Sequence, residues 1–386
     1  MKSNLVGSIA VCGALLLTCG VARADRGTDV DIKAADGTRL KATYYSAGKP
    51  GPGIVLLHMC NSERKAWATL GPKLAAKGMH AIALDYRGYG QSGGKRYTEW
   101  SPEERARMTT KAWPSDIDAA LGYLASRPGV DGKRLAAAGG SCGVNEAVQL
   151  ARRHAEVKTL VLLAGGTDTA GQEHLARASW IPIFGVAAED DADAVGLMRW
   201  IVGFSSNPAN RLKTYAKGGH GTALFPVHAD LEPAIVSWFE TYLVTHPAPA
   251  PAAGAKGQPG PSARVAAELR GSGGAARMRQ RLREARKAGK PLALAPEGAI
   301  NLLGYEHLQA GRVQDAIQVL ELNVEAYPES ANTYDSLADA YVAAKDTAKA
   351  AEYARKALDV LARDKNAGED QRKLIRESAE AKLKKK

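Results

Sequence analysis

Five runs of apolar residues restrict the fold of this 386-residue chain more than any other feature. The runs are GIVLL (53–57), HAIAL (80–84), RLAAAG (134–139), TLVLLAG (159–165) and IPIFGVAA (181–188). Stretches with the periodicity of amphipathic helices separate them. Strands that are apolar on both faces and alternate with helices form a mainly parallel sheet covered by helices. The sequence therefore predicts an α/β fold.

Two further patterns set the limits of this sheet domain. Before the first apolar run, residues 29–47 have the pattern of two short strands joined at Asp36-Gly37, a pair typical of hairpin turns. After the last run come a strand, RLKTYAKG (211–218), and a closing helix, LEPAIVSWFETYL (231–243). We therefore expect the sheet domain to span residues 25–246.

The composition changes abruptly after the closing helix. The segment PAPAPAAGAKGQPGP (247–261) is almost wholly Pro, Ala and Gly and cannot bury a core, so we expect an interdomain linker over 247–262. Beyond it, every strong pattern is helical. We expect a separate all-α domain over residues 263–386.

Part of the helical region repeats itself at a spacing of 34 residues, over about 297–363. The matching positions are Leu303, Gly304 and Ala316 in the first copy and Leu337, Ala338 and Ala350 in the second. This resembles a pair of tetratricopeptide repeats, in which small residues lie where two antiparallel helices approach closely. His307 and Asn323 depart from that pattern. An ordinary pair of helical hairpins is the alternative, and the helices expected around 275–287 and 370–384 would serve as caps.

Residues 1–24 have the pattern of a secretory signal, with Lys2, an apolar run and a small-x-small site before Asp25. The apolar run is shorter than the roughly 20 residues that a membrane-spanning helix needs. We expect the mature chain to begin near Asp25 and to be periplasmic or secreted. Residues 16–19, LLTC, also resemble a lipoprotein processing site faintly, so we expect membrane association only if Cys19 is lipidated.

The formal net charge of +11 is concentrated in two stretches. Residues 262–290 hold nine Lys and Arg against two Glu, and residues 372–386 hold seven against two. The rest of the chain is close to neutral, and no nucleic-acid-binding motif accompanies the basic stretches. We therefore expect solvated basic surfaces and no nucleic-acid partner.

A G-x-S-x-G motif, GGSCG (139–143), directly follows one apolar run and directly precedes a helical pattern. A sharp turn from strand to helix exposes the central serine above the edge of the sheet, and the flanking small residues avoid clashes in that turn. The helix N-terminus behind the turn favours developing negative charge. Ser141 is the candidate nucleophile.

A serine nucleophile needs a base, and the base needs an orienting acid. After RLKTYAKG comes the glycine-rich segment GGHG, so His220 is the candidate base. After the run IPIFGVAA comes EDD (189–191), at the carboxyl end of a strand. We choose Asp191 as the acid, with Asp190 as its main competitor.

Together these motifs resemble the α/β-hydrolase superfamily over residues 29–247. A further match is DYRGYGQSG (85–93), which is similar to the D-x-R-G-x-G-x-S turn after the fourth strand of that superfamily. About fourteen residues separate Gly166 from the start of the next strand, too few for a large cap domain. The resemblance is therefore to compact, dienelactone-hydrolase-like esterases with a fairly open site.

The resemblance also implies an oxyanion hole made of two backbone N–H groups. One belongs to the residue after the nucleophile, here Cys142. The other comes from the loop after the third strand, HMCN (58–61), where Met59 replaces the glycine usual in the family. By position we favour Cys60 as the second donor, with Met59 as the alternative.

Cys60 and Cys142 are the only cysteines left once residues 1–24 are removed. Two N–H groups aimed at one oxygen imply neighbouring backbones, and a disulfide needs Cα atoms only about 4.4 to 6.8 Å apart. A Cys60–Cys142 bridge and two buried free thiols both fit the sequence. A third interpretation makes Cys142 the nucleophile, but Ser141 holds the central position between Gly139 and Gly143.

The sequence thus predicts an exported serine hydrolase that cleaves carboxylic esters or related acyl bonds through Ser141, His220 and Asp191. Its substrate would be a small-molecule or polymer-borne ester, and the chemistry requires no metal or organic cofactor. A peptidase or amidase with the same triad is one alternative. Another is a non-catalytic scaffold whose repeats bind a protein or peptide. Trp100, Trp113 and Trp180 either line an acyl pocket or pack on the sheet.

Overall fold

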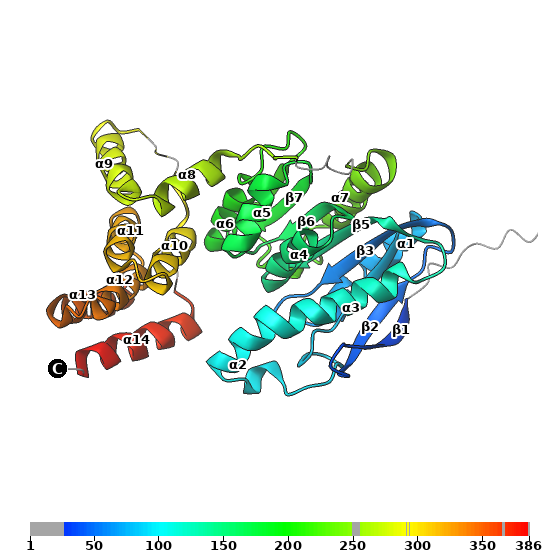
Figure 1. The fold of residues 1–386 in the computed structure, drawn as a ribbon, viewed down its shortest axis with the longest axis horizontal. Helices are drawn as coiled ribbons and strands as arrows, with labels where there is room; N and C mark the ends of the chain where they lie inside the picture. The colour runs from blue at the N-terminus through cyan, green and yellow to red at the C-terminus, as the bar shows by residue number, and fades with distance from the viewer. Residues whose placement is uncertain (1–26, 249–254, 291, 293, 365–366, 385–386) are drawn as a thin grey trace, which may run out of the picture.

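The computed structural model describes residues 27–248, 255–290, 292, 294–364 and 367–384. It consists of a sheet flanked by helices and, beside it, an array of helices (Figure 1). The expected export signal, residues 1–24 with Cys19, lies outside the described residues. Among those described, no helix combines the length and the apolar character needed to cross a bilayer.

Within the described residues, eight strands form one sheet in the order β1-β2-β4-β3-β5-β6-β7-β8. The strands are β1 (Thr28–Lys33), β2 (Arg39–Tyr45), β3 (Gly51–Leu57), β4 (His80–Leu84), β5 (Val130–Gly140), β6 (Val157–Leu163), β7 (Ile183–Ala188) and β8 (Arg211–Tyr215). Strand β2 pairs antiparallel with both β1 and β4, and the remaining pairs are parallel. This is the α/β-hydrolase arrangement, and it confirms the predicted fold class.

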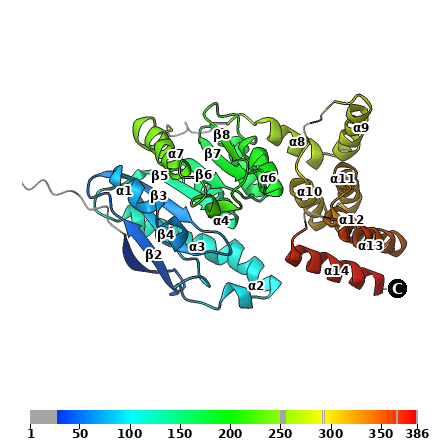
Figure 2. The ribbon, with the colours of Figure 1, turned by 180° about the vertical axis from the view of Figure 1, so that it is seen from behind.

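Helices cover both faces of the sheet, which explains why the parallel strands β3, β4, β6 and β7 are buried along almost their whole length (Figure 2). They are α1 (Leu70–Ala76), α2 (Pro102–Arg107), α3 (Trp113–Ala125), α4 (Cys142–Arg153), α5 (Thr169–Arg177), α6 (Ala192–Val202) and α7 (Leu231–Phe239). Short helical turns lie at Arg64–Trp67 (η1), Tyr97–Glu99 (η2), Met108–Ala112 (η3), Gly221–Leu224 (η4) and Glu240–Thr245 (η5). Along β3, Val55 and Leu57 join the core under α3 to α6, whereas Ile54 and Leu56 join the core under α1 and α7. Strand β3 therefore contributes to two cores by alternation.

The turn after β4 ties two loops of the sheet domain together. Asp85 is fully buried, and its carboxylate accepts from the backbone N–H groups of Arg64 (2.7 Å) and Gln91 (2.9 Å) and pairs with the Arg64 guanidinium. The Ser92 hydroxyl donates to the Asp85 carbonyl at 2.6 Å. The motif at 85–93 thus has a structural role, fixing the chain just after the 58–61 loop.

The C-terminal part, which we call the helical module (residues 261–384), is a succession of antiparallel helices. They are α8 (Pro261–Arg270), α9 (Gly274–Lys287), α10 (Glu297–Gln309), α11 (Val313–Ala326), α12 (Ala331–Ala343), α13 (Thr347–Leu361) and α14 (Glu369–Lys384). Helices α10 and α12 begin 34 residues apart, as do α11 and α13. A Cβ added at Gly304 would lie 2.6 Å from the Leu320 side chain, so α10 and α11 approach each other closely at that glycine.

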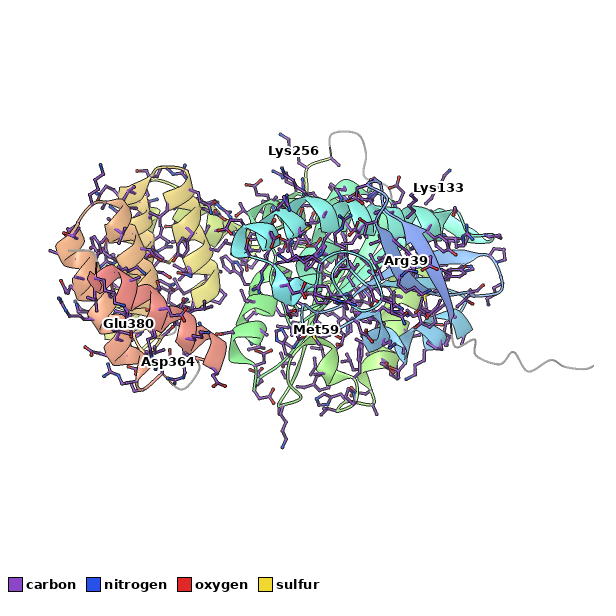
Figure 3. The ribbon with its side chains drawn as sticks, turned by 90° about the horizontal axis from the view of Figure 1, so that it is seen from below. Arg39, Met59, Lys133, Lys256, Asp364 and Glu380 are labelled. Atoms are coloured by element: carbon purple, nitrogen blue, oxygen red, sulfur yellow. A yellow bond between two sulfur atoms is a disulfide. The ribbon has the colours of Figure 1, made fainter. Side chains whose placement is uncertain are left out.

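The segment expected to be a linker is partly docked on the sheet domain. Gly257 and Gly260 donate backbone hydrogen bonds to Arg177 (2.8 Å) and Phe204 (2.8 Å), and Ser262 donates to Gly203 (3.0 Å). Figure 3 marks Lys256 close to where the described chain resumes beside the sheet domain. Helix α8 begins at Pro261, slightly before the expected end of the linker. Composition did not predict this docking, because the hydrogen bonds come from the backbone.

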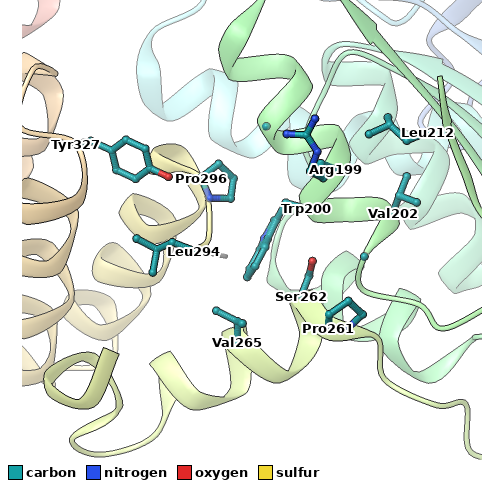
Figure 4. A pocket seen from close by; sticks show the side chains of 12 residues that line it. Arg199, Trp200, Val202, Leu212, Pro261, Ser262, Val265, Leu294, Pro296 and Tyr327 are labelled. Carbon is teal, nitrogen blue, oxygen red and sulfur yellow. The ribbon is translucent and has the colours of Figure 1, made fainter. Parts of the chain in front are cut away.

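An apolar seam joins the helical module to the sheet domain. Trp200 and Phe204 share one continuous core with Ala263 and Ala266 of α8. A hollow of about 500 Å³ remains between α6 and α8, with Trp200 on one side and Val265 on the other (Figure 4). The module is therefore held by an extended contact as well as by the chain connection.

We expect Gly304→Val to destabilise the helical module, because the added side chain must displace Leu320 between α10 and α11. Overpacking of this kind typically costs about 1 to 3 kcal/mol. Gly298→Ala, on the same helix, is the control, since a Cβ at Gly298 meets nothing within 4 Å. Urea unfolding followed by far-ultraviolet circular dichroism measures both. Equal free energies of unfolding for the two variants would contradict the close approach.

Candidate active site

Ser141 lies in the turn that joins β5 to α4. Its backbone is in a sparsely populated conformation, with φ 52° and ψ −121°, and its N–H donates to the Leu163 carbonyl at 2.9 Å. The turn admits only small neighbours: a Cβ at Gly139 would lie 2.0 Å from the Gly143 carbonyl oxygen, and one at Gly143 would lie 2.4 Å from that of Leu57. Such strain is characteristic of a nucleophile presented above a sheet.

The structure brings Ser141, His220 and Asp191 together. The Nε2 atom of His220 is 2.8 Å from the Ser141 hydroxyl oxygen, and its Nδ1 atom contacts the Asp191 carboxylate. A carboxylate only accepts, so Nδ1 carries the proton and Nε2 is free to accept from the hydroxyl. The His220 side chain is 46% exposed, so the group is open to solvent.

The two partners of Ser141, Asp191 and His220, lie in the segments that follow strands β7 and β8. Asp191 lies three residues after the end of β7, at the N-cap position of α6, and His220 lies between β8 and η4. Asp190, the competing acid, has a different partner: its carboxylate accepts from the backbone N–H groups of Gly218 (3.0 Å) and Gly219 (3.3 Å). Asp190 therefore holds the loop that carries the histidine, while its neighbour contacts the imidazole.

The two predicted oxyanion donors lie side by side. The Cα atoms of Cys60 and Cys142 are 5.8 Å apart and a disulfide joins the two residues. Within the described part of the chain, neither backbone N–H has a protein acceptor. Of the interpretations that the sequence left open, the structure contains the bridge. It links the loop after β3 to the first residue of α4.

Met59 occupies the position where α/β-hydrolases usually have glycine, and its side chain contacts the loop that carries His220. Its sulfur accepts from the Thr222 N–H at 3.4 Å, and a Cβ at Gly221 would lie 2.3 Å from that sulfur. Only a residue without a side chain fits at Gly221. The sequence indicated that Met59 was unusual but not that it supports the loop next to His220.

His58 has a structural role in the 58–61 loop. It is fully buried, its Nδ1–H donates to the Met59 carbonyl at 2.7 Å, and its Nε2 accepts from the Tyr86 N–H at 3.2 Å. Burial lowers the pKa of the His58 imidazole to about 4, so the ring stays neutral. His58 thereby fixes the backbone of the 58–61 loop.

Two of the three tryptophans considered as pocket residues are buried in an aromatic cluster. Trp100 and Trp113 are 5% and 1% exposed and pack against Tyr97. Tyr89, in the same cluster, donates its hydroxyl to the Cys60 carbonyl at 2.8 Å. The cluster therefore supports the disulfide loop from behind. Trp180 packs against the core under α3 to α6.

Glu146, one turn after the nucleophile on α4, is a buried carboxyl that the sequence gave no reason to single out. It is 2% exposed, and its Oε1 accepts from the Asn145 amide at 3.3 Å. Its Oε2 has no hydrogen-bond partner among the described residues. Burial raises the pKa of Glu146 to about 7. No cluster of three or more His, Cys, Asp and Glu side chains suited to a metal ion occurs in the described ranges.

Glu146 should make the free energy of unfolding depend on pH. Its carboxyl titrates near 4.5 when unfolded and near 7 when folded, so the folded chain holds a proton that the unfolded chain releases between these values. This contribution to stability is complete below pH 4.5 and is lost as the pH rises through 7.

We expect Glu146→Gln to be more stable than the parent at pH 8, by on the order of 3 kcal/mol, and to match it near pH 4. Urea unfolding at both pH values measures the difference, with Glu156→Gln on the surface as the control. A Glu146→Gln curve parallel to the parent curve across this range would contradict the raised pKa.

Comparison with known proteins finds a matching family model, two sequence relatives and several similar solved structures. Residues 48–190 match the family model described as serine aminopeptidase, S33. Two uncharacterized proteins of Mycobacterium tuberculosis, from strains CDC 1551 / Oshkosh and H37Rv, are each 30% identical over 161 residues. That similarity covers 41% of this chain and 52% of each relative, so it extends over about half of their length.

Similar solved structures include an esterase of Pyrococcus furiosus, 16% identical, which covers 56% of this chain and 93% of its own with a TM-score of 0.42. A dienelactone hydrolase of Anabaena variabilis is 17% identical and covers 56% of this chain and 98% of its own, with a TM-score of 0.44. The strand order gives residues 27–248 the α/β-hydrolase fold, and the family match includes Ser141 and ends at Asp190.

Proposed function

We propose that this chain is a serine hydrolase that cleaves carboxylic esters through an acyl-enzyme intermediate. The observation that carries the proposal is the 2.8 Å contact between His220 Nε2 and the Ser141 hydroxyl, with Asp191 on the opposite ring nitrogen. Nucleophile, base and orienting acid in hydrogen-bond order are the arrangement that activates a serine hydroxyl.

In the first half-reaction, the Ser141 hydroxyl attacks the ester carbonyl as His220 Nε2 accepts its proton. The Asp191 carboxylate stabilises the imidazolium that results. The backbone N–H groups of Cys142 and Cys60 donate to the oxyanion, aided by the positive end of α4. His220 then protonates the departing alkoxide, leaving the acyl group on Ser141.

In the second half-reaction, a water molecule attacks the acyl-enzyme while His220 accepts its proton. The open position of His220 gives water access without displacement of a lid. Collapse of the second oxyanion releases the carboxylic acid and returns the proton to Ser141.

The match to a serine aminopeptidase family favours a second candidate, cleavage of a peptide or amide bond by the same residues. The difference lies in the leaving group, because His220 would protonate an amine rather than an alkoxide. Comparing p-nitrophenyl esters with amino-acid p-nitroanilides distinguishes the two candidates.

We propose that helices α10 to α13 are a pair of tetratricopeptide repeats. The 34-residue spacing of their starts and the close approach at Gly304 support this assignment. His307 and Asn323, which depart from the repeat pattern, are buried and donate to the carbonyl oxygens of Leu269 (3.3 Å) and Glu297 (3.2 Å). The comparison of Gly304→Val with Gly298→Ala tests the packing on which the assignment depends.

We expect Ser141→Ala to abolish ester hydrolysis and labelling by a fluorophosphonate probe. Asp191→Asn should lower kcat about 10⁴-fold, because it disturbs the tautomer of His220. Asp190→Asn is the matched control on the adjacent residue and should have a much smaller effect. Hydrolysis of p-nitrophenyl acetate measures all three variants.

Labelling that persists in Ser141→Ala would contradict the serine mechanism. A folded parent protein that neither turns over nor takes up the probe would favour the non-catalytic scaffold instead.

We propose that the protein is exported and that cleavage before Asp25 leaves Cys60 and Cys142 as its cysteines. An oxidising compartment suits the bridge between them. Peptide mapping without reductant on protein recovered from the periplasm or medium should find an N-terminus at Asp25 and a Cys60–Cys142 linked peptide. An intact N-terminus would contradict the proposed export. Alkylation of both cysteines without prior reduction would contradict the bridge.

A further inference from the structure

A second hollow of about 370 Å³ lies on the seam between the sheet domain and the helical module. One wall comes from the sheet domain, with Gly166, Leu197 and Ile201. The facing wall comes from the first turns of α10, with Gly298, Ala299 and Leu302. The hollow therefore exists only because the helical module is docked where it is.

Two of the residues that line this hollow, Asn145 and Gly166, lie near the backbone of Ser141. Asn145, which also lines it, follows Ser141 by one turn of α4, about 6 Å along the helix axis. On the other side, Gly165 is so close to the nucleophile that a Cβ there would lie 2.3 Å from the Ser141 carbonyl oxygen, and Gly166 is the next residue. The Ser141 backbone is therefore within about one helical turn of residues that line the hollow.

The side chains of Asn145, Thr167 and Asp168 around the hollow are all hydrogen-bonded within the sheet domain. The Asn145 carbonyl oxygen accepts from the Thr167 hydroxyl (2.9 Å) and from the Asp168 N–H (3.1 Å). The Asp168 carboxylate in turn accepts from the Gln149 amide (2.6 Å) and the Gly171 N–H (2.8 Å). The remaining lining is aliphatic apart from Trp200 and Gln172, so the hollow suits an apolar occupant.

The wall formed by α10 is held in place. Arg270 of α8 pairs with Glu306 of α10 at 3.2 Å and donates to Gln172 of the sheet domain at 3.1 Å. Gly196 of α6 also lies close to the start of α10, since a Cβ there would lie 3.3 Å from the Pro296 side chain. These contacts hold the α10 wall at a defined position relative to the sheet domain.

We propose that this hollow binds a linear aliphatic acyl chain of the ester substrate, and that α10 is its specificity wall. The inference rests on the proposed function and names the substrate class. An acyl chain is the part of an ester that stays covalently next to Ser141 after the alcohol leaves.

Gly298→Phe tests the proposal, because Gly298 lines the hollow and a Cβ there meets nothing within 4 Å, which leaves room for the ring to enter. The readout is the ratio of kcat/KM for p-nitrophenyl octanoate to that for the acetate. Each buried methylene is worth about fourfold, so the parent should favour octanoate by at least about tenfold. Gly298→Phe should lower that ratio by at least about tenfold. Gly122→Phe, at another glycine whose Cβ meets nothing within 4 Å, is the matched control and should leave both rates unchanged.

Isothermal titration of octanoate into the Ser141→Ala protein gives a second readout that does not depend on turnover. Binding that is lost on adding Gly298→Phe and kept on adding Gly122→Phe supports the hollow. An active parent with no chain-length preference and no octanoate binding overturns the inference and leaves the proposed function standing. A parent that is inactive and unlabelled overturns the proposed function, and the titration still decides whether the hollow binds an aliphatic chain.

Discussion

The close packing of three backbones around Gly139 and Gly143 is the constraint on which the rest of the site depends. These glycines let the β5–α4 turn pass within contact of the chain at the end of β3, and the turn forces Ser141 into its strained conformation. Because the parallel strands end at one edge, the loops after β7 and β8 reach the same place with the acid and the base. The chemistry is therefore assembled by the edge of the sheet rather than by any single loop.

A second layer of contacts fixes those loops. Asp190 holds the backbone of the histidine loop from one side, and the Met59 side chain supports it from below. His58 and Tyr89 hold the disulfide loop through its carbonyl oxygens. None of these residues touches a reacting atom, but together they determine where His220 and the oxyanion donors point.

Some of this arrangement could be predicted from the sequence and some could not, for physical reasons. The strands, Ser141, Asp191 and His220 were accessible because apolar periodicity and short motifs report directly on local structure. The bridge between Cys60 and Cys142 was left open because side-chain direction depends on tertiary geometry. The docking of residues 257–262 was missed because it uses backbone hydrogen bonds, to which composition is blind. Glu146 was missed because one carboxyl on a helix gives no sign that its face is buried.

The disulfide also divides the chain topologically. Its cysteines are 82 residues apart, and the loop that they close contains α1, β4, α2, α3 and β5. Closing a loop of that length removes conformations from the unfolded chain, which in the chain-entropy model stabilises the fold by about 4 to 5 kcal/mol. Asp191 and His220 lie outside the closed loop. Reduction would therefore remove the covalent restraint on the two oxyanion donors. Asp191 and His220 would still be positioned by β7 and β8, which the disulfide does not enclose.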